Sequence, residues 1–399
     1  MTGANTFSVS GYGPERSSLS RLLARDSLAR RLDWPILLSA LALSFMGAIL
    51  VYSATRNRTE INQGDQYYFL IRHLMNTGIG FCLMIGTVWL GHRNLRTAVP
   101  ILYGLSVFLI LMVLTPLGAT VNGAHAWIVL GGGFSLQPSE FVKITIILGM
   151  AMLLAARVDA GDKAYPDHRT VLQALGLAAV PMMVVMLMPD LGSVMVMVII
   201  VLGVLLASGA SNRWIFGLLG TGALGAVLVW QLGILDEYQI NRFAAFANPE
   251  LDPSGVGYNT NQARIAIGSG GLTGTGLFHG SQTTGQFVPE QQTDFVFTVA
   301  GEELGFVGAG LIILLLGVVL WRACRIARET TELYGTIVAA GIIAWFAFQS
   351  FENIGMTLGI MPVAGLPLPF VSYGGSSMFA VWVAVGLLQS IRVQRPMSA

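Results

Sequence analysis

The chain has 399 residues, of which 54% are hydrophobic and only 11% are charged, with a net charge of +1. Soluble domains carry about 25% charged residues, so the composition excludes an ordinary soluble protein and predicts a membrane protein. The near-zero net charge says nothing about partners, and no nucleic-acid partner is expected. Two cysteines, Cys82 and Cys324, lie in or beside apolar runs, so no disulfide framework is implied.

The first apolar run, residues 34–55, has 22 residues and no charge. It is long enough to cross a membrane core that needs about 20 residues, and no signal-peptide cleavage site follows it. Further apolar runs centre near residues 74–91, 99–117, 141–156, 170–189, 191–208, 214–235, 304–321, 335–351 and 375–391. The sequence therefore predicts an all-α polytopic membrane protein with ten transmembrane helices. Two of these helices are expected to extend past charged residues into a polar cavity, at Lys143 and at Glu302 and Glu303.

Arginines and lysines are distributed unevenly between the two sets of loops, which sets the orientation of the chain. One set, with both tails, contains Arg16, Arg21, Arg25, Arg30, Arg31, Arg93, Arg96, Arg157, Lys163, Arg169, Arg213, Arg322, Arg325, Arg328, Arg392 and Arg395. The other set contains Arg56, Arg58, Arg242 and Arg264. We therefore expect a basic cytoplasmic tail over 1–33, a transmembrane domain over 34–391 and a cytoplasmic tail over 392–399. A long extracellular loop, 236–293, then lies between helices 7 and 8.

The long outer loop contains two further patterns. The piece "NTNQARIAIGSGG" mixes apolar and polar positions and predicts a short interfacial helix. The run "GSGGLTGTGLFHG" is rich in glycine, but it lacks the ending of a phosphate-binding loop and follows no predicted strand. We therefore exclude a nucleotide site, and the five scattered histidines show no metal-ligand spacing.

Several acids and one lysine adjoin predicted spans, where ionisable residues indicate function. Glu140 and Lys143 lie three residues apart in "QPSEFVK" and would share a helix face. A structural ion pair and a role in binding an anionic substrate both remain open for them. Asp190, in "MPDLGS", favours a helix N-cap. Glu302 and Glu303 favour a structural role, paired with arginines inside the bundle.

Asp294 stands directly before an apolar run in "FVPEQQTDFVF", at the outer end of a predicted span. An N-cap is one explanation for an acid at this place, and a general base is the other. The outer-face group comprises Asp294, Glu290, Arg242, Arg264, Lys143 and Glu140. The cations could hold a diphosphate while the aspartate accepts a proton from a hydroxyl group. A lipid-linked sugar diphosphate would fit a site at the outer surface of the membrane.

Three segments resemble one family of membrane proteins. They are "GAHAWIVLGGGFSLQPSEFVK", "NPELDPSGVGYNTNQARIAIGSGGLTGTGLFHGSQTTGQFVPEQQTDFVFTVAGEELGFVG" and "GIMPVAGLPLPFVSYGGSS". These segments resemble the SEDS family, the RodA, FtsW and SpoVE peptidoglycan glycosyltransferases. The match runs in order from the first predicted helix to the last, and "PVAGLPLPFVSYGG" is most like the RodA branch.

The resemblance implies ten transmembrane helices, both termini inside, in the cytoplasmic membrane of a bacterium. It implies polymerisation of lipid II into glycan strands at the outer face, and partnership with a class B penicillin-binding protein, a transpeptidase. The family's catalytic aspartate falls on Asp294, in Thr-Asp-Phe, and its functional lysine falls on Lys143, with Glu140 beside it. The Trp of the preceding loop falls on Trp127. Ala126 and Gln292 depart from the family, where Arg and His are frequent.

The expected reaction is attack by the 4-hydroxyl of an acceptor lipid II on an anomeric carbon that bears undecaprenyl diphosphate. Asp294 would take the proton, and Lys143, Arg242 and Arg264 would stabilise the departing diphosphate. A divalent cation, Mg²⁺ or Mn²⁺, could assist the diphosphate, but no ligand set is legible. Two alternatives remain: a transporter that flips lipid II, and a noncatalytic scaffold for the transpeptidase. A transporter would place its ionisable residues near the membrane midplane.

Overall fold

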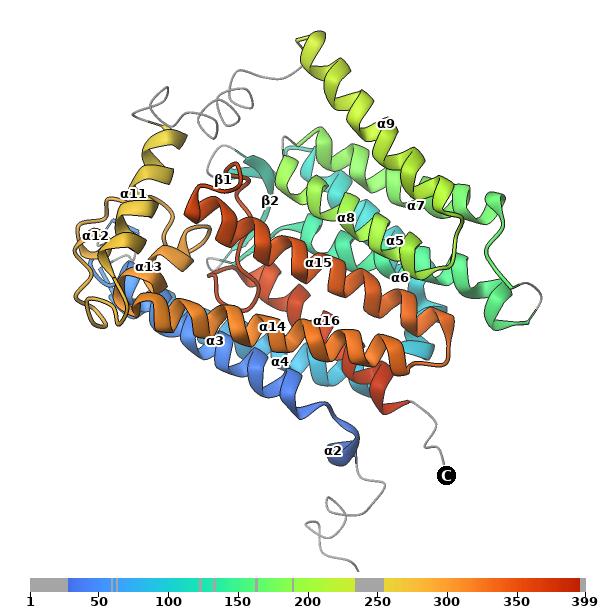
Figure 1. Ribbon diagram of the computed structural model, residues 1–399, viewed down its shortest axis with the longest axis horizontal. Coiled ribbons are helices and arrows are strands. Elements are labelled where there is room, and N and C mark those ends of the chain that lie inside the picture. Colours follow the sequence, from blue (N-terminus) through green and yellow to red (C-terminus); the bar gives the residue numbers. More distant parts are fainter. Residues whose placement is uncertain are drawn as a thin grey trace, which may run out of the picture.

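The computed structural model describes residues 28–394 except 59, 62–63, 122–123, 132–133, 162–163, 189 and 234–254. Most of the predicted basic tail and the first part of the long outer loop, Arg242 included, therefore lie outside the described residues. Long helices lie side by side and pack into one bundle (Figure 1). The helices are α2 Leu28–Arg31, α3 Trp34–Thr55, α4 Tyr68–Leu90, α5 His92–Val113, α6 Pro138–Asp159, α7 His168–Met186, α8 Leu191–Ala207, α9 Asn212–Gln231, α11 Val256–Ser269, α12 Ser281–Thr284, α13 Val296–Glu303, α14 Gly305–Glu329, α15 Leu333–Leu358 and α16 Gly375–Val393.

The described helices confirm a polytopic, helical membrane protein. Eight of them are long and apolar enough to cross a membrane, namely α3, α4, α5, α6, α7, α14, α15 and α16. Helix α8 is apolar but has 17 residues, and α9, with 20 residues, covers most of the seventh predicted run. Each predicted apolar run therefore coincides with a helix.

The prediction that the helix over 304–321 extends without a break past Glu302 and Glu303 is wrong. The acids Glu302 and Glu303 end the short helix α13, and α14 begins only at Gly305. The chain breaks there because Gly305 has a φ of +64°, a left-handed conformation that glycine adopts without strain. A Cβ atom at Gly305 would also lie only 2.3 Å from the backbone nitrogen of Gly274. The break therefore also lets the outer loop approach α14 closely.

A small antiparallel sheet departs from the all-α prediction. Strands β1 (Gly118–Val121), β2 (Ala124–Gly131) and β3 (Phe134–Leu136) pair in the order β1-β2-β3. The sequence between the strands reads Asn-Gly at 122–123 and Gly-Gly at 132–133, which are hairpin signals beside alternating apolar residues. Helix α6 starts two residues after β3, and the backbone N–H of Gln137 donates to Ser376 Oγ at 2.8 Å. The sheet is thereby joined to the start of α16.

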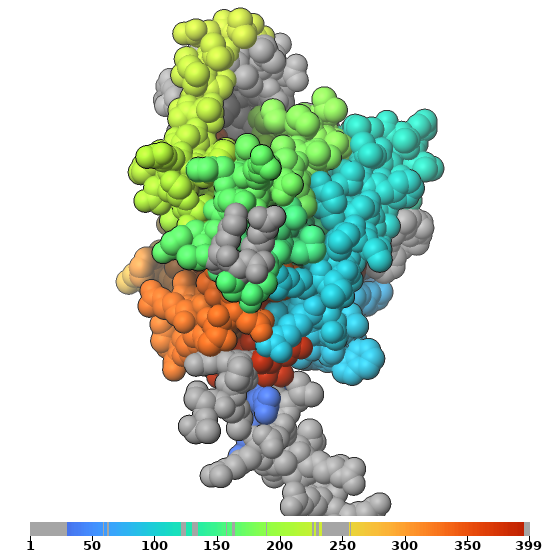
Figure 2. Space-filling model, turned by 90° about the vertical axis from the view of Figure 1, so that its right-hand side faces the viewer, coloured from blue at the N-terminus to red at the C-terminus, as the bar shows by residue number. Residues whose placement is uncertain are grey.

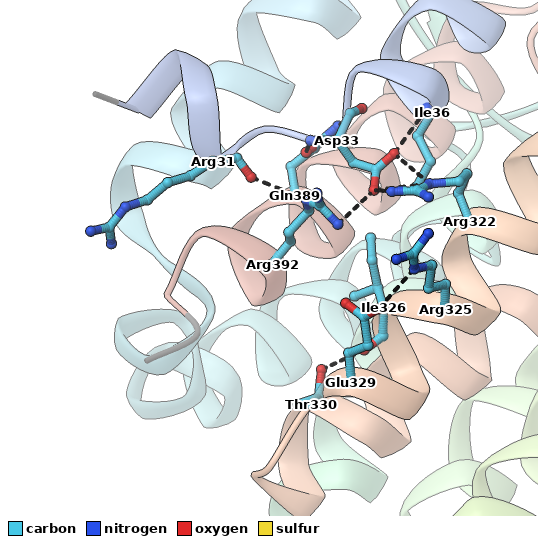
Figure 3. Close-up of polar contacts among 10 residues, drawn as sticks. All are labelled: Arg31, Asp33, Ile36, Arg322, Arg325, Ile326, Glu329, Thr330, Gln389 and Arg392. Carbon is cyan, nitrogen blue, oxygen red and sulfur yellow. Dashed lines mark hydrogen bonds and ion pairs between the residues drawn. The ribbon is translucent and has the colours of Figure 1, made fainter. Parts of the chain in front are cut away.

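The ends of α3, α14 and α16 meet at a buried junction, which Figure 3 shows. Asp33 is fully buried and caps α3, and its carboxylate accepts hydrogen bonds from Arg322 at 2.6–3.2 Å. Arg392 lies 3.0 Å from the same carboxylate. Gln389 Oε1 accepts from the backbone N–H of Asp33 at 2.7 Å, and its Nε2 donates to the Asp33 carbonyl at 2.9 Å. One acid therefore fixes the first and last membrane helices and α14 to one another.

Other basic residues lie at the same end of the bundle. Arg96 pairs with Asp159 at 2.8 Å, joining the start of α5 to the end of α6, and Arg93 pairs with Glu332 just before α15. The backbone N–H of Leu333 donates to Asp159 at 2.9 Å. Figure 2 looks onto this face, where the cyan start of α5, the green end of α6 and the orange end of α14 lie together. The described arginines Arg93, Arg96, Arg322 and Arg392, which the sequence assigns to the cytoplasm, therefore lie at one end of the bundle.

The opposite end of the bundle carries α11, α12, α13 and the sheet (Figure 1). Helix α11 confirms the predicted short helix. The loop after it docks on α13, because the backbone N–H of Thr275 donates to the Glu302 carbonyl at 2.9 Å. The Glu302 carboxylate accepts from the backbone N–H groups of Gln282 (2.7 Å) and Thr283 (2.9 Å), and Glu303 accepts from Ser53 Oγ at 2.5 Å. These contacts fit the structural role expected of the two acids. The hydrogen bonds above come from amides and a hydroxyl group, and the charge of Arg56 also acts on Glu303.

Candidate functional site

Asp294 lies half-buried in the segment that leads into α13. The N-cap residue of α13 is Phe295, which makes no side-chain capping bond, so Asp294 stands one residue before the N-cap position. A Cβ atom at Gly365 would lie 3.5 Å from Asp294 Oδ2, so the carboxylate faces the loop between α15 and α16. The Asp294 carbonyl accepts from Asn353 Nδ2 at 2.7 Å. The backbone of Asp294 is therefore held by Asn353, and its carboxylate faces the segment "GIMPVAGLPLPFVSYGGSS".

Two motif segments far apart in the sequence meet at this place. Ser372 Oγ donates to the Thr293 carbonyl at 2.5 Å, and the backbone N–H of Tyr373 donates to the Gln292 carbonyl at 2.8 Å. Phe295 packs in a small apolar cluster with Val288, Ala263, Ala266 and Val363. The segment around Asp294 is thus fixed on one side by the 359–374 loop and on the other by α11.

Glu290 shapes the turn before Asp294. It has a φ of +50°, and its carbonyl accepts from the backbone N–H groups of Thr293 and Phe295 at 3.2 Å each. Its carboxylate accepts from Gln292 Nε2 at 3.2 Å and from Thr293 Oγ1 at 3.1 Å. Burial lowers the pKa of the nearby Arg58 guanidinium, and the negative charge of Glu290 opposes that shift. Glu290 therefore acts on the conformation of the segment that carries Asp294.

Lys143 and Glu140 form the ion pair that their spacing predicts. The distance from Lys143 Nζ to Glu140 Oε1 is 2.8 Å, and the two side chains are 0% and 1% exposed. Lys143 Nζ also donates to Gln349 Oε1 at 3.2 Å and lies 4.8 Å from the centre of the Trp345 ring. The ammonium group is therefore enclosed by protein groups on α6 and α15, and it is not exposed to the outer surface.

The remaining predicted residues lie at different places. Arg264 is exposed on α11, and a Cβ atom at Gly359 would lie 3.3 Å from its Cδ, so it borders the start of the 359–374 loop. Trp127 is half-buried in β2, opposite Ala119 of β1. Asp190 caps α8 by accepting from the backbone N–H of Ser193 at 3.0 Å, which confirms its predicted role.

Sequence reasoning missed four polar residues near this site. Gln349, Glu352 and Asn353 are fully buried in α15, and Arg72 of α4 lies 4.3 Å from the centre of the Tyr68 ring. Burial raises the pKa of the Tyr373 hydroxyl, and the positive charge of Arg72 opposes that shift, so Arg72 borders the same loop. An acid in the apolar segment "AWFAFQSFENIG" was the available signal for Glu352.

A metal site is not evident in the part of the chain that the structure describes. No three His, Cys, Asp or Glu side chains among these residues lie close enough together to hold an ion. The described residues offer a carboxylate at this place, and Arg264 and Arg72 border the 359–374 loop that the carboxylate faces.

Comparison with known proteins places this arrangement in one family. The family model described as "Cell cycle protein", which covers FtsW, RodA and SpoVE, matches residues 33–396. The chain belongs to the SEDS family. It is a multi-pass membrane protein of bacteria. The resemblance to the family is confirmed, and the likeness to the RodA branch stays a prediction.

Several relatives match over nearly their whole length. Stage V sporulation protein E of Bacillus subtilis is 38% identical over 90% of this chain and 96% of the relative. A probable peptidoglycan glycosyltransferase FtsW of Trichlorobacter lovleyi is 36% identical over 90% and 92%, respectively. The peptidoglycan glycosyltransferase MrdB of Escherichia coli is 34% identical over 92% and 95%. These SEDS relatives differ little in identity, so identity alone does not separate the branches of the family.

Solved structures agree with the SEDS fold. A chain from a peptidoglycan synthase complex, described as coordinating polymerization and crosslinking, superposes with a TM-score of 0.74 at 30% identity, covering 92% of this chain and 99% of that one. The rod shape determining protein RodA of Thermus thermophilus superposes with a TM-score of 0.65 at 29% identity, covering 92% and 98%.

Proposed function

We propose that this SEDS protein polymerises lipid II into glycan strands at the outer face of the cytoplasmic membrane, with Asp294 as the general base. Its relatives FtsW and MrdB are named as peptidoglycan glycosyltransferases and match over at least 90% of this chain. The chain is accordingly a peptidoglycan glycosyltransferase of cell wall synthesis, in elongation or division. The proposal adds the substrate, the face of the membrane and the residue that takes the proton.

The placement of Asp294 carries the proposal. Its carboxylate faces Gly365, while its backbone carbonyl accepts from Asn353 and the preceding carbonyl accepts from Ser372. A base whose position is fixed before substrate binds avoids reorganisation during the reaction. The N-cap position of α13 falls on Phe295, so Asp294 stands one residue before the helix, in the segment that these contacts hold.

In the proposed reaction, the 4-hydroxyl of the acceptor lipid II attacks the anomeric carbon of the donor. Asp294 accepts the hydroxyl proton, and the bond from the anomeric carbon to the undecaprenyl diphosphate breaks. In-line displacement converts an α-linked donor into a β-linked polymer. Negative charge grows on the departing diphosphate, and exposed Arg264, beside the 359–374 loop, is the first proposed cation that meets it. Arg242 is the second proposed cation.

The proposed topology has ten transmembrane helices, with α8 and α9 completing the eight longer spans. Both termini are cytoplasmic, at the arginine-rich end that contains Asp33, Arg322 and Arg392. The loop before α13 then faces outward, where lipid II presents its sugars. The proposed protein partner is a class B penicillin-binding protein, which fits the similarity to a chain of a peptidoglycan synthase complex.

The test is a polymerisation assay. Purified protein in detergent, with and without its transpeptidase, is supplied with lipid II, and the products are scored for glycan strands. We expect strands whose synthesis depends on this chain. A scaffold would give no strands in any combination. A transporter would translocate labelled lipid II across vesicles without making strands, and either result would refute the proposal.

A further inference from the structure

Helix α15 carries a buried row of polar side chains that leads toward Asp294. Trp345, Gln349 and Asn353 are spaced four residues apart, so they lie on one face of the helix. Each of the three side chains is 0% exposed. Buried polar groups in a membrane span are costly unless they are satisfied, so a row of this kind requires partners. We refer to Trp345, Gln349 and Asn353 as the polar row.

Gln349 joins the buried ion pair to the 359–374 loop. Its Oε1 accepts from Lys143 Nζ at 3.2 Å and from Trp345 Nε1 at 2.6 Å. Its Nε2 donates to the carbonyl of Pro367 at 2.7 Å. The location of Lys143 therefore fixes the side chain of Gln349, and Gln349 fixes the backbone of the loop.

Asn353 joins the same loop to Asp294. Its Nδ2 donates to the carbonyls of Leu366 and Asp294, at 2.7 Å each. Because Leu366 directly precedes Pro367, the two amide side chains hold neighbouring carbonyls of one short stretch. A continuous path of hydrogen bonds and one peptide link thus runs from Lys143, through Gln349 and the loop, to the backbone of Asp294.

We propose that Gln349 and Asn353 are positioning residues for Asp294, and that Lys143 serves the reaction through them rather than by contact with the diphosphate. The inference rests on the role proposed for Asp294. Lys143 is 0% exposed, and its ammonium group already meets Glu140, Gln349 and the Trp345 ring. A substrate phosphate could reach it only if this enclosure opened.

The expected size of the effect follows from the geometry. A misplacement of about 1 Å at a reacting group, caused by a remote change, can lower the rate by about 10²-fold. Residues that do not touch the substrate should leave its binding unchanged. We therefore expect a loss in kcat without a matching rise in KM for lipid II.

The experiment compares two amide-to-acid variants with a matched control. Asn353→Asp keeps the side-chain shape and removes the donor to Asp294 and Leu366. Gln349→Glu keeps an acceptor for Lys143 and removes the donor to Pro367. Gln389→Glu is the control for placing an acid inside the bundle. Gln389 is equally buried and lies at the end of α16 that is remote from the 359–374 loop, beside Asp33. All are purified with the transpeptidase, and their thermal unfolding and lipid II polymerisation kinetics are measured.

We expect kcat to fall about 10- to 100-fold in Asn353→Asp and in Gln349→Glu, with KM within about two-fold of wild type. Gln389→Glu should retain the wild-type kcat at a similar loss of thermal stability. If one of the first two variants does not fold, the other decides the matter. A kcat within about two-fold of wild type in both variants would overturn the proposal, and so would a rise in KM with an unchanged kcat.

A double-mutant cycle tests whether Lys143 acts through Gln349. Lys143→Met combined with Gln349→Glu should be no slower than the slower single variant, because both changes break one path. If the losses in kcat of the two single variants multiply in the double variant, or if KM rises in Lys143→Met, Lys143 makes a separate contact with the diphosphate and this part is refuted.

Asp294→Asn is assayed alongside these variants. If it is inactive while the variants of the polar row are fully active, this inference fails and the proposed function stands; an active Asp294→Asn refutes the role of Asp294 itself.

Discussion

At the scale of single residues, the buried pair of Glu140 and Lys143 follows directly from the sequence. A spacing of three residues on a helix brings the two side chains together, and the structure places them 2.8 Å apart. The contacts that connect the pair to Gln349, and Asn353 to Asp294, could not be predicted from the sequence. Lys143 meets Gln349 across 206 residues of sequence, and Asn353 meets Asp294 across 59. No local pattern in a single sequence indicates such tertiary hydrogen bonds.

The pair predicts an asymmetry in stability. Glu140→Gln leaves a buried lysine without its counter-ion, and breaking a buried pair costs about 3–5 kcal/mol. The double variant Glu140→Gln, Lys143→Met removes both charges and should recover most of the lost thermal stability. Thermal unfolding in detergent measures both. Equal or greater instability of the double variant would show that the two residues are not coupled.

At the scale of the elements, hydropathy predicts which segments become helices but not where they end. Helix α4 begins at Tyr68, six residues before the predicted run. Hydropathy placed the start too late because Arg72 and His73 interrupt the apolar run. The predicted outer extension through Glu302 failed because one glycine in a left-handed conformation breaks the helix. The three short strands were not predicted because their apolar residues adjoin apolar runs that were assigned to helices. The Asn-Gly and Gly-Gly pairs nevertheless mark the turns between the strands.

The helix break predicts a sharp contrast between two glycines. Gly305→Ala should cost more than about 1–2 kcal/mol, since the left-handed conformation alone costs that much and the new Cβ would meet the backbone of Gly274. Gly310→Ala, one turn into the same helix, meets nothing within 4 Å and should not lower stability. Thermal unfolding of the two variants checks this, and equal melting temperatures would contradict the account of the break.

The buried junction around Asp33 allows a second contrast. Asp33→Asn leaves Arg322 and Arg392 without their shared acid in a buried place, so we expect a loss of about 3–5 kcal/mol. Arg325→Gln removes an exposed pair with Glu329 on one helix, which is worth about 0–1 kcal/mol (Figure 3). Chemical denaturation of both variants in detergent provides the measurement. A similar loss in the two variants would mean that the junction does not hold the three helix ends together.

At the scale of the whole molecule, the gathering of arginines at one end predicts the orientation of the chain. A cysteine at Thr284, exposed in α12, should react with an impermeant reagent in intact cells, after Cys82 and Cys324 are replaced. A cysteine at Glu329, at the end of α14, should react only after lysis. The opposite labelling pattern would reverse the topology and remove the site from the outer face.

The central claim is that Asp294 accepts the proton, and one measurement tests it most directly. Asn has almost the shape of Asp but cannot take up a proton, and general base catalysis contributes about 10²–10⁴-fold. Strand synthesis from lipid II is compared for wild type and Asp294→Asn at matched expression, with co-purification of the transpeptidase and the melting temperature as controls for folding. The account predicts normal folding and partner binding, with at least about a 10²-fold loss of strand synthesis. Synthesis within a few-fold of wild type would contradict it.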